Sequence, residues 1–425
     1  YYAVKAPVFS FEKLTDVDTG LGPEMKSTGE CLGLAESFPQ ALLKAFKGAG
    51  LKAPKRGGRI IITVKDEDKQ EIVGIARGFE EMGIELFATS GTCDALTEAG
   101  IQYTLYDGTQ PNPTFDNIED ARSLYVENNC EAIIAFGGGS SMDCAKVAAA
   151  RVVRPNTPIP KMRGVLKVLR KLPPFFAVPT TAGTGSETTI AAVVTNPKTH
   201  EKYAINDPVL RPKYAVLDPE LTVGLPPHIT STTGMDALTH AVEAYIGHSN
   251  TRDTEENAKR AVKMIFDNIE TVYRDGKNIE ARGEMLLASY YAGVAFTRAY
   301  VGYVHAIAHN LGGMYGIAHG LANAIILPYV LEYYGESAHK RLAELAEAAS
   351  ITQPGMTDAQ KAEAFIAAIR RLNQDMNIPD KIEQIQEKDI PTLVERALKE
   401  GNPLYPVPKI MNEADCEMVI RRLMP

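Results

Sequence analysis

Two segments of this 425-residue chain carry potential metal ligands at helical spacing, and together they constrain how the chain can fold. His305 and His309 are four residues apart in an apolar stretch, so on a helix they share one face, and His319 follows ten residues later. Asp236 and His240 have the same four-residue spacing upstream. If these side chains bind one ion, the two segments must pack against each other.

One carboxylate and three imidazoles suit Fe(II) or Zn(II) and leave a position for substrate. The proposed ligands are Asp236, His240, His305 and His319. Alternatively, the histidines are ordinary core residues, and Asp236 and His240 form a purely structural contact. A buried carboxylate would still need a partner for its charge, and a metal ion would be one.

Composition excludes several classes of protein. Hydrophobic residues make up 45% and charged residues 23%, as is ordinary for globular proteins, and the net charge of -8 argues against nucleic acid or anionic membranes as partners. The sequence has neither an uncharged apolar run of membrane-spanning length nor a signal-peptide pattern at its start, so we expect a cytoplasmic protein. Five scattered cysteines predict free thiols, and a first residue of Tyr1 suggests a fragment, a processed product or a joined sequence.

Two loops follow buried strands and have the composition of a nucleotide site. Gly137, Gly138 and Gly139 stand between an expected strand and helix, where missing side chains let a pyrophosphate approach the backbone. The Rossmann spacing G-x-G-x-x-G is not met, because Met142 occupies the third position. The second loop offers the hydroxyls of Thr180, Thr181, Thr184 and Ser186 to phosphate, ribose or nicotinamide. An ordinary turn explains it as well, but ligands of open α/β sheets gather at the carboxyl ends of strands.

The chain divides by pattern into residues 1–57, an α/β domain over 58–226 and a helical domain over 227–425. A strand, helix and strand over 59–92 begin a parallel unit, a strand is expected at 101–108, and two paired strands at 191–197 and 202–208. A strand at 215–227 is expected to lead out of the sheet. Amphipathic helices are expected at 228–245, 251–272, 279–299, 302–311 and 319–333.

A first resemblance covers about residues 1–100. LGPEMKSTGE and the run from Gly57 to Thr92 resemble the C-terminal part of the carbamoyl-phosphate synthetase large subunit, namely the tail of an ATP-grasp unit and the start of a methylglyoxal-synthase-like regulatory domain. There Lys69, Thr89 and Thr92 match positions that bind the phosphate of an allosteric nucleotide. Most of the ATP-grasp machinery is not in the sequence, so carbamoyl phosphate synthesis is not expected.

A second resemblance covers about residues 101–425. GGGSSMDCAK, PTTAGTGSE, GMDALTHAVEAY and the H-x3-H-x9-H pattern occur in the order and intervals of the iron-containing alcohol dehydrogenase family. The resemblance implies a dinucleotide-binding domain with a Rossmann-like parallel sheet, followed by an all-α metal-binding domain, in the architecture of dehydroquinate synthase. A join between the two resemblances near Ile101 would be a natural fusion, an engineered chimera or an assembly artefact, with the foreign strand-helix-strand unit replacing the family's own.

The resemblance also assigns residues. It makes the four proposed ligands iron ligands and makes His309 a non-ligand histidine that relays protons. Phe296 matches the substrate pocket. The positions that match the family's cofactor site are Asn112, Gly138, Gly139, Ser140, Asp143, Thr180, Thr181, Thr184, Ser186 and Lys202.

The implied reaction is hydride transfer between a primary or small alcohol, or its aldehyde, and NAD or NADP, with Fe(II) or else Zn(II), in a homodimer. Two alternatives remain: a zinc enzyme of the wider superfamily, such as a glycerol dehydrogenase or a dehydroquinate-synthase-like lyase, and a catalytically silent chimera that binds a nucleotide effector. The family's Asp that holds the adenosine ribose corresponds here to Ser90, or else to Asp66 or Asp68, which leaves NAD and NADP open.

Overall fold

The computed structural model describes residues 104–197 and 202–425 throughout. Before residue 104 it describes the backbone of four strands and the single helical residues Lys44 and Arg77. The chain divides into two units, Tyr1–Tyr103 and Thr104–Pro425. This division does not test the domain boundaries after residues 57 and 226, which stay predictions.

The first unit contains two strand pairs. β1 (Tyr2–Val8) and β2 (Gly29–Ala35) are antiparallel, whereas β3 (Arg59–Ile62) and β4 (Glu85–Ala88) are parallel. A parallel pair needs a long crossover between its strands, as the strand-helix-strand pattern of this stretch predicts. Lys69, Thr89 and Thr92 lie outside the described residues, as do Asp66, Asp68 and Ser90.

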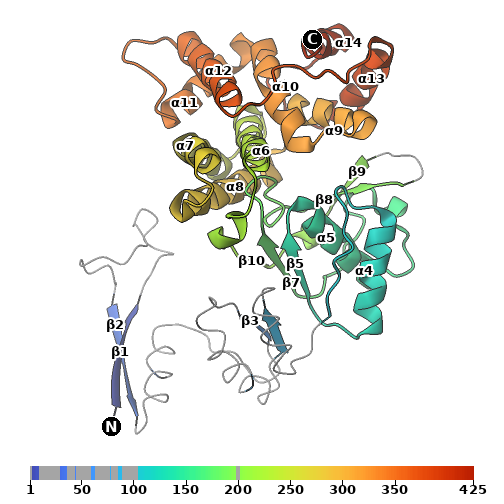
Figure 1. Ribbon diagram of the computed structural model, residues 1–425, viewed down its shortest axis with the longest axis vertical. Helices are drawn as coiled ribbons and strands as arrows, with labels where there is room; N and C mark the ends of the chain where they lie inside the picture. The colour runs from blue at the N-terminus through green and yellow to red at the C-terminus, as the bar shows by residue number, and fades with distance from the viewer. Residues whose placement is uncertain are drawn as a thin grey trace. The chain divides into compact units, whose positions relative to one another are not determined.

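A parallel three-stranded sheet forms the α/β part of the second unit (Figure 1). Its order is β10-β7-β5, with β5 at Ile133–Gly137, β7 at Phe175–Pro179 and β10 at Tyr214–Ala215. In the β5–β7 register Gly137 is opposite Pro179. Both candidate cofactor loops therefore leave the sheet at the same end, where ligands of open α/β sheets bind.

Helices α4 (Phe115–Glu127) and α5 (Gly139–Val153) pack together, and α5 also packs on the sheet. Their core contains apolar side chains such as Ile118, Val147 and Ala177, none of them exposed. A second, mixed sheet has the order β6-β9-β8, with β6 at Gly164–Val165, β8 at Ala191–Thr195 and β9 at Lys202–Asn206. The predicted pairing of its two longer strands is confirmed, since β8 and β9 are antiparallel.

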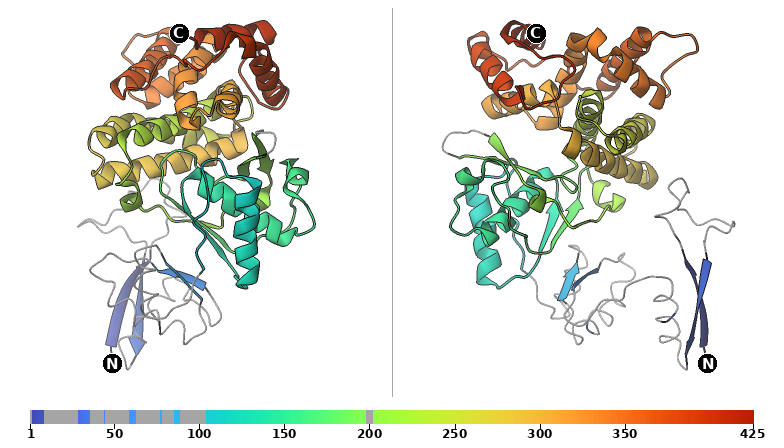
Figure 2. Two further views of the ribbon diagram at one scale, coloured as in Figure 1. Left: turned by 45° about the vertical axis from the view of Figure 1, so that its right-hand side comes forward. Right: turned by 180° about the vertical axis from the view of Figure 1, so that it is seen from behind.

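The rest of the second unit is helical, and the expected helices are present within a few residues of their predicted limits. Figures 1 and 2 show α6, α7 and α8 between the three-stranded sheet and the orange to red helices of the C-terminal end. The helices are α6 (Pro227–Ile246), α7 (Arg252–Arg274), α8 (Ile279–Ala299), α9 (Tyr303–Tyr315), α10 (His319–Tyr334), α11 (Glu336–Ala348), α12 (Asp358–Asp375), α13 (Ile390–Gly401) and α14 (Glu413–Arg422).

Helix α6 is central to this half of the unit. From Gly234 to Ile246 every side chain is buried, because α7, α8 and α10 all pack against it. A helix buried on all sides can place polar groups in an environment that excludes water, provided that they find partners there. Within the part of the chain that is described, no helix has both the length and the apolarity to cross a membrane.

Two predicted strands differ from the structure. Residues 104–110, the described part of the strand expected at 101–108, have no regular secondary structure. Their alternating pattern ends at a Gln-Pro-Asn-Pro turn, and proline removes backbone donors that a strand needs. The strand expected from Ala215 shrinks to the two residues of β10, since Asp218 caps a short 3-10 turn, Pro219–Thr222, that starts with a proline.

Candidate metal centre and cofactor loops

Three helices bring the four predicted metal ligands together. Asp236 and His240 come from α6, His305 from α9 and His319 from the first turn of α10. One potential ligand atom of each side chain lies within 4.8 Å of the others, and all except His319 are buried. The structure therefore brings the four predicted side chains together at one point, and their role as metal ligands stays a prediction.

The protonation of these histidines suits metal binding. Burial lowers the pKa of His240, lowers that of His319 to about 4, and together with the neighbouring histidines lowers that of His305 well below its usual range. All three imidazoles are therefore neutral at pH 7, and each keeps a nitrogen lone pair for a cation.

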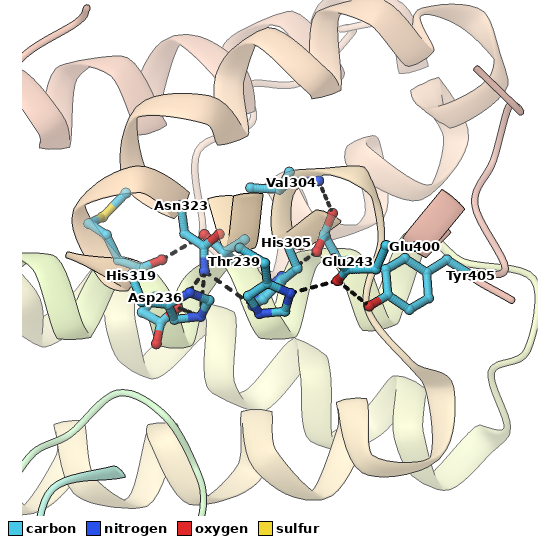
Figure 3. Close-up of polar contacts among 11 residues, drawn as sticks. Asp236, Thr239, Glu243, Val304, His305, His319, Asn323, Glu400 and Tyr405 are labelled. Atoms are coloured by element: carbon cyan, nitrogen blue, oxygen red, sulfur yellow. Dashed lines mark hydrogen bonds and ion pairs between the residues drawn. The ribbon is translucent and has the colours of Figure 1, made fainter. Parts of the chain in front are cut away.

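Asn323, one turn after His319 on α10, fills the space among the ligands (Figure 3). Its Nδ2 lies 2.7 Å from Oδ1 of Asp236, 3.2 Å from Nε2 of His305 and 3.1 Å from Nε2 of His319. An amide nitrogen has two protons, so three acceptors converge on a group that cannot satisfy them all. The point where they meet favours positive charge.

Two buried atoms of this cluster have no hydrogen-bond partner among the described residues: Nδ1 of His240 and Oδ1 of Asn323. Such atoms are costly in a buried site unless a ligand completes it. An orphaned imidazole nitrogen, neutral histidines and a carboxylate fit a divalent cation of the Fe(II) or Zn(II) kind. The residues present thus fit the metal that the sequence predicts.

His305 has a buried acidic neighbour, Glu243 of α6. Oε2 of Glu243 is 2.6 Å from Nδ1 of His305, and both side chains are almost fully buried. Burial raises the pKa of Glu243 to about 7, although three backbone N–H groups at the start of α9 oppose the shift. Glu243 was not predicted from the sequence. The signal that could have found it is a carboxylate three positions after His240 on a largely apolar helix, because a buried acidic residue needs a partner.

His309 does not join the four ligands and has a different partner. Its Nδ1 lies 2.6 Å from Oε1 of Glu400 on α13, which also accepts a hydrogen bond of 2.9 Å from the hydroxyl of Tyr405. Burial lowers the pKa of His309, but the Glu400 carboxylate outweighs it, so the pKa is raised. The ring stacks on His319 with centroids 5.1 Å apart. Its separation from the ligand set agrees with the predicted proton relay, a role that stays a prediction.

Phe296 of α8 stacks on His240, with ring centroids 4.2 Å apart and the planes inclined by 14°. The phenyl ring therefore forms an apolar wall beside the ligand cluster. This position is compatible with the predicted substrate pocket, a role that stays a prediction.

The two candidate cofactor loops lie side by side. The Thr180 N–H donates to the carbonyl of Gly137 at 3.0 Å, and a Cβ added at Gly138 or Gly139 would contact Thr181 or Thr184. Asn112, with φ of 58°, donates its N–H to the Ser140 hydroxyl at 3.1 Å. The predicted cofactor residues of three separate segments are therefore neighbours.

Asp143 and Ser186 are occupied by the protein itself. Oδ1 of Asp143 accepts a hydrogen bond of 2.8 Å from the Ser186 hydroxyl, and Oδ2 accepts one of 3.0 Å from the N–H of Val193. Both residues thus tie the second loop to α5 and β8. Their direct contact with a cofactor stays a prediction.

Lys146, which the sequence reasoning left unassigned, is fully buried beside them. Its Nζ lies within 2.6–3.1 Å of five oxygens, contributed by Ser186, Thr189 and Ala191. Burial lowers the pKa of Lys146 to about 8, against the attraction of Asp143 and Glu187. The buried ammonium group of Lys146 therefore stabilises the conformation of the second loop through these contacts.

Lys202 reaches from β9 towards the metal centre. A Cβ added at Gly312 of α9 would lie 3.4 Å from Nζ of Lys202. Burial lowers the pKa of Lys202. Its charge adds to the fall in the pKa of His319 and opposes the rise in the pKa of His309. The residue thus stands between the α/β part and the metal helices, where a cofactor contact is expected.

Comparison with known proteins agrees with this geometry. Residues 230–424 match the model of the C-terminal part of the Fe-containing alcohol dehydrogenase family, and residues 83–219 match that of iron-containing alcohol dehydrogenase. The chain belongs to the iron-containing alcohol dehydrogenase family. The match begins at residue 83, earlier than the boundary expected near Ile101, so the stretch before Ile101 also contains family sequence.

Individual relatives of this iron-containing alcohol dehydrogenase support the assignment. A 1,3-propanediol dehydrogenase from Klebsiella pneumoniae is 38% identical over 337 residues, which are 79% of this chain and 87% of that enzyme. An NAD-dependent methanol dehydrogenase from Bacillus methanolicus is 36% identical over 307 residues, 72% of this chain and 80% of that enzyme. The solved structure of an alcohol dehydrogenase from Oenococcus oeni matches with a TM-score of 0.74 at 34% identity, covering 86% of this chain and 92% of that one.

These findings confirm the predicted fold class and, at the level of the family, the predicted activity: an iron-type alcohol dehydrogenase with NAD-dependent relatives. They give no support to the synthetase-like origin of the N-terminal residues. The roles of single residues follow from the geometry and stay predictions.

Proposed function

We propose that this protein is a metal-dependent alcohol dehydrogenase that transfers hydride between a small primary alcohol, or its aldehyde, and a nicotinamide cofactor. The observation that carries the proposal is the buried cluster of Asp236, His240, His305 and His319. It lies in the same unit as two glycine- and threonine-rich loops at the carboxyl ends of parallel strands.

Each chemical task has a candidate group. Fe(II), when bound, polarises the oxygen of the alcohol or aldehyde as a Lewis acid, and the nicotinamide carries the hydride. Asp236 and the three neutral histidines hold the cation, and Phe296 supplies an apolar wall for the carbon chain. His309 takes the alcohol proton on the nitrogen that does not contact Glu400, and Glu400 stabilises the imidazolium that forms.

The test is a screen of primary alcohols and diols with NAD+ or NADP+ on metal-free protein reloaded with Fe(II) without oxygen, or with Zn(II). We expect turnover that depends on the added metal and is higher with Fe(II). If metal-loaded protein binds NADH but turns over no alcohol and reduces no aldehyde, the proposal is wrong. Titration with NADH and NADPH decides the cofactor, because the candidates for the ribose contact, Asp66, Asp68 and Ser90, lie outside the described residues.

For the residues before the family match that begins at residue 83, we propose a relationship to the synthetase regulatory region, supported by LGPEMKSTGE and the matched position of Lys69. Calorimetric titration with nucleoside monophosphates tests whether this region binds an effector. Binding that is lost on Lys69→Ala supports the proposal, and no binding by the unsubstituted chain rejects an effector role. A cytoplasmic location and a homodimer belong to the same set of proposals.

A further inference from the structure

The carboxylate of Glu243 connects two helices of the proposed metal centre. Glu243 lies three residues after His240 on α6, and its side chain is 1% exposed. Oε2 is 2.6 Å from Nδ1 of His305, and Oε1 accepts a hydrogen bond of 2.8 Å from the N–H of Val304 (Figure 3). One carboxylate thus contacts both a ligand side chain and the backbone of the helix that carries it.

The contact to Val304 supplies a cap that α9 does not have in its own sequence. The N-cap position of α9 is Gly302, which has no side chain to accept the first backbone N–H groups of the helix. A carboxylate is the best partner for the N-terminus of a helix, where the helix dipole is positive. A Cβ at Gly302 would lie 2.7 Å from Oε1 of Glu243, so the glycine is what allows the carboxylate to approach.

The contact to His305 decides which ring nitrogen faces the other ligands. A carboxylate that accepts a proton at Nδ1 leaves the lone pair on Nε2. Nε2 is the atom of His305 that faces Asn323, among the atoms of Asp236 and His319. Without the carboxylate, the imidazole could carry its proton on Nε2, where it would repel a cation.

We propose that Glu243 is a positioning residue that fixes the tautomer and orientation of His305 for metal binding while capping α9. This inference rests on the proposed metal site and adds a fifth side chain to it. Residues that hold a ligand histidine in this way commonly contribute 10–100-fold to metal affinity. Oε1 caps α9 and Oε2 contacts His305, so a suitable variant can remove the contact to His305 and keep the cap.

Glu243→Gln is that variant. The amide oxygen can still accept from the Val304 N–H, whereas the amide nitrogen replaces the acceptor next to Nδ1 of His305. The probe is Co(II), which accepts the same nitrogen and oxygen ligands and whose visible absorption reports its coordination. Glu332→Gln on α10 is the matched control, because Glu332 makes ion pairs with Arg370 and Arg422 away from the cluster.

Metal-free protein of each variant is titrated with Co(II). For Glu243→Gln we expect a 10–100-fold weaker affinity and an altered absorption spectrum, with a metal-free melting temperature close to that of the parent. Glu332→Gln should stay within twofold of the parent. A Glu243→Gln affinity within twofold of the parent overturns the inference, and a parent protein that binds no Co(II) overturns the proposed metal site and the inference with it.

A second measurement does not depend on the variant folding. In the Zn(II)-loaded parent, nitrogen NMR of the histidine rings, assigned with His305→Ala, should show the His305 proton on Nδ1. A proton on Nε2 contradicts the inference even if Glu243→Gln fails to fold.

Discussion

The cofactor loops and the metal centre both bury polar groups, but they satisfy them in opposite ways. Beneath the cofactor loops, Nζ of Lys146 has five oxygens within 2.6–3.1 Å, and both oxygens of Asp143 accept hydrogen bonds from the protein. In the metal centre three acceptors converge on the one amide of Asn323, while Nδ1 of His240 and Oδ1 of Asn323 find no partner within the described ranges.

Beneath the cofactor loops the protein itself supplies the partners of the buried polar groups. In the metal centre a bound cation would have to supply them. Buried polar networks that are fully satisfied rigidify their surroundings, whereas partly satisfied ones are costly. We therefore expect the loop after β7 to keep its shape without cofactor, and the metal centre to gain order when it binds a cation. Substitutions beneath the cofactor loops should accordingly change the free energy of unfolding, whereas substitutions in the metal centre should change metal affinity.

The largest effect is expected from His305→Ala. Loss of a ligand should weaken metal affinity by more than the roughly 100-fold typical of a supporting residue, and turnover should fall with it. Metal content by mass spectrometry and alcohol oxidation measure the two effects. His248→Ala, an exposed histidine just beyond α6, is the control. A fully metallated, active His305→Ala protein would exclude His305 as a ligand.

The next effect is expected from Lys146→Met, which removes the ammonium group that five oxygens share. The free energy of unfolding should fall by about 3 kcal/mol, because buried acceptors lose their partner and nearby Asp143 and Glu187 lose a positive charge. Urea denaturation of metal-free protein measures this change. Co(II) affinity should stay within twofold of the parent, and exposed Lys171→Met should change neither. Wild-type stability in Lys146→Met would show that the network does not support the fold.

A smaller effect with a defined pH range is expected from Glu187. Burial raises the pKa of its carboxyl from 4.5 to about 7. The folded state therefore binds a proton that the unfolded state releases, so this contribution to stability is complete below pH 4.5 and is lost as the pH rises through 7.

Glu187→Gln is permanently neutral and lacks this dependence. The free energy of unfolding of the parent, relative to that of Glu187→Gln, should fall by about 2 kcal/mol between pH 5 and pH 8. Denaturant unfolding at both pH values measures the difference. A constant or opposite difference would mean that Glu187 is ionised throughout.

The smallest effect is expected from Phe296→Ala, which removes the wall beside His240 but no ligand. Catalytic efficiency with small primary alcohols should fall by about tenfold, with a relative gain for longer chains, since apolar contacts discriminate by about 1–3 kcal/mol. Steady-state kinetics across a series of alcohol lengths measures it. Unchanged chain-length preference would place the substrate elsewhere.

Local spacing explains what the sequence predicted correctly. Asp236 and His240, like His305 and His309, are one turn apart, so their shared faces follow from helix geometry alone. The helical half and the strands before the two loops were predicted for the same reason, because their periodicity is local. The strand expected at 101–108 was wrong over its described part, since an alternating pattern does not provide a neighbouring strand.

The residues that the sequence did not reveal act across long separations. Lys146 reaches oxygens 40 or more positions away, Glu243 reaches His305 over 62, and Glu400 reaches His309 over 91. Such pairs become visible only when the tertiary packing is known. Each of the three is an ionisable side chain in a buried or half-buried position. Hydrophobic periodicity does not show which distant residue such a side chain contacts.

Gly185 and Gly293 bring the backbone of the loop after β7 against the backbone of α8. A Cβ on Gly185, whose φ is +60°, would lie 2.7 Å from Cα of Gly293, and one on Gly293 would lie 2.9 Å from the Gly185 carbonyl. Displacing reacting groups by about 1 Å can slow an enzyme by about 100-fold. The direct contact of these two backbones therefore sets how closely the candidate cofactor loop approaches α8, the helix that carries Phe296. A single methyl group on either glycine would push the loop and the helix apart.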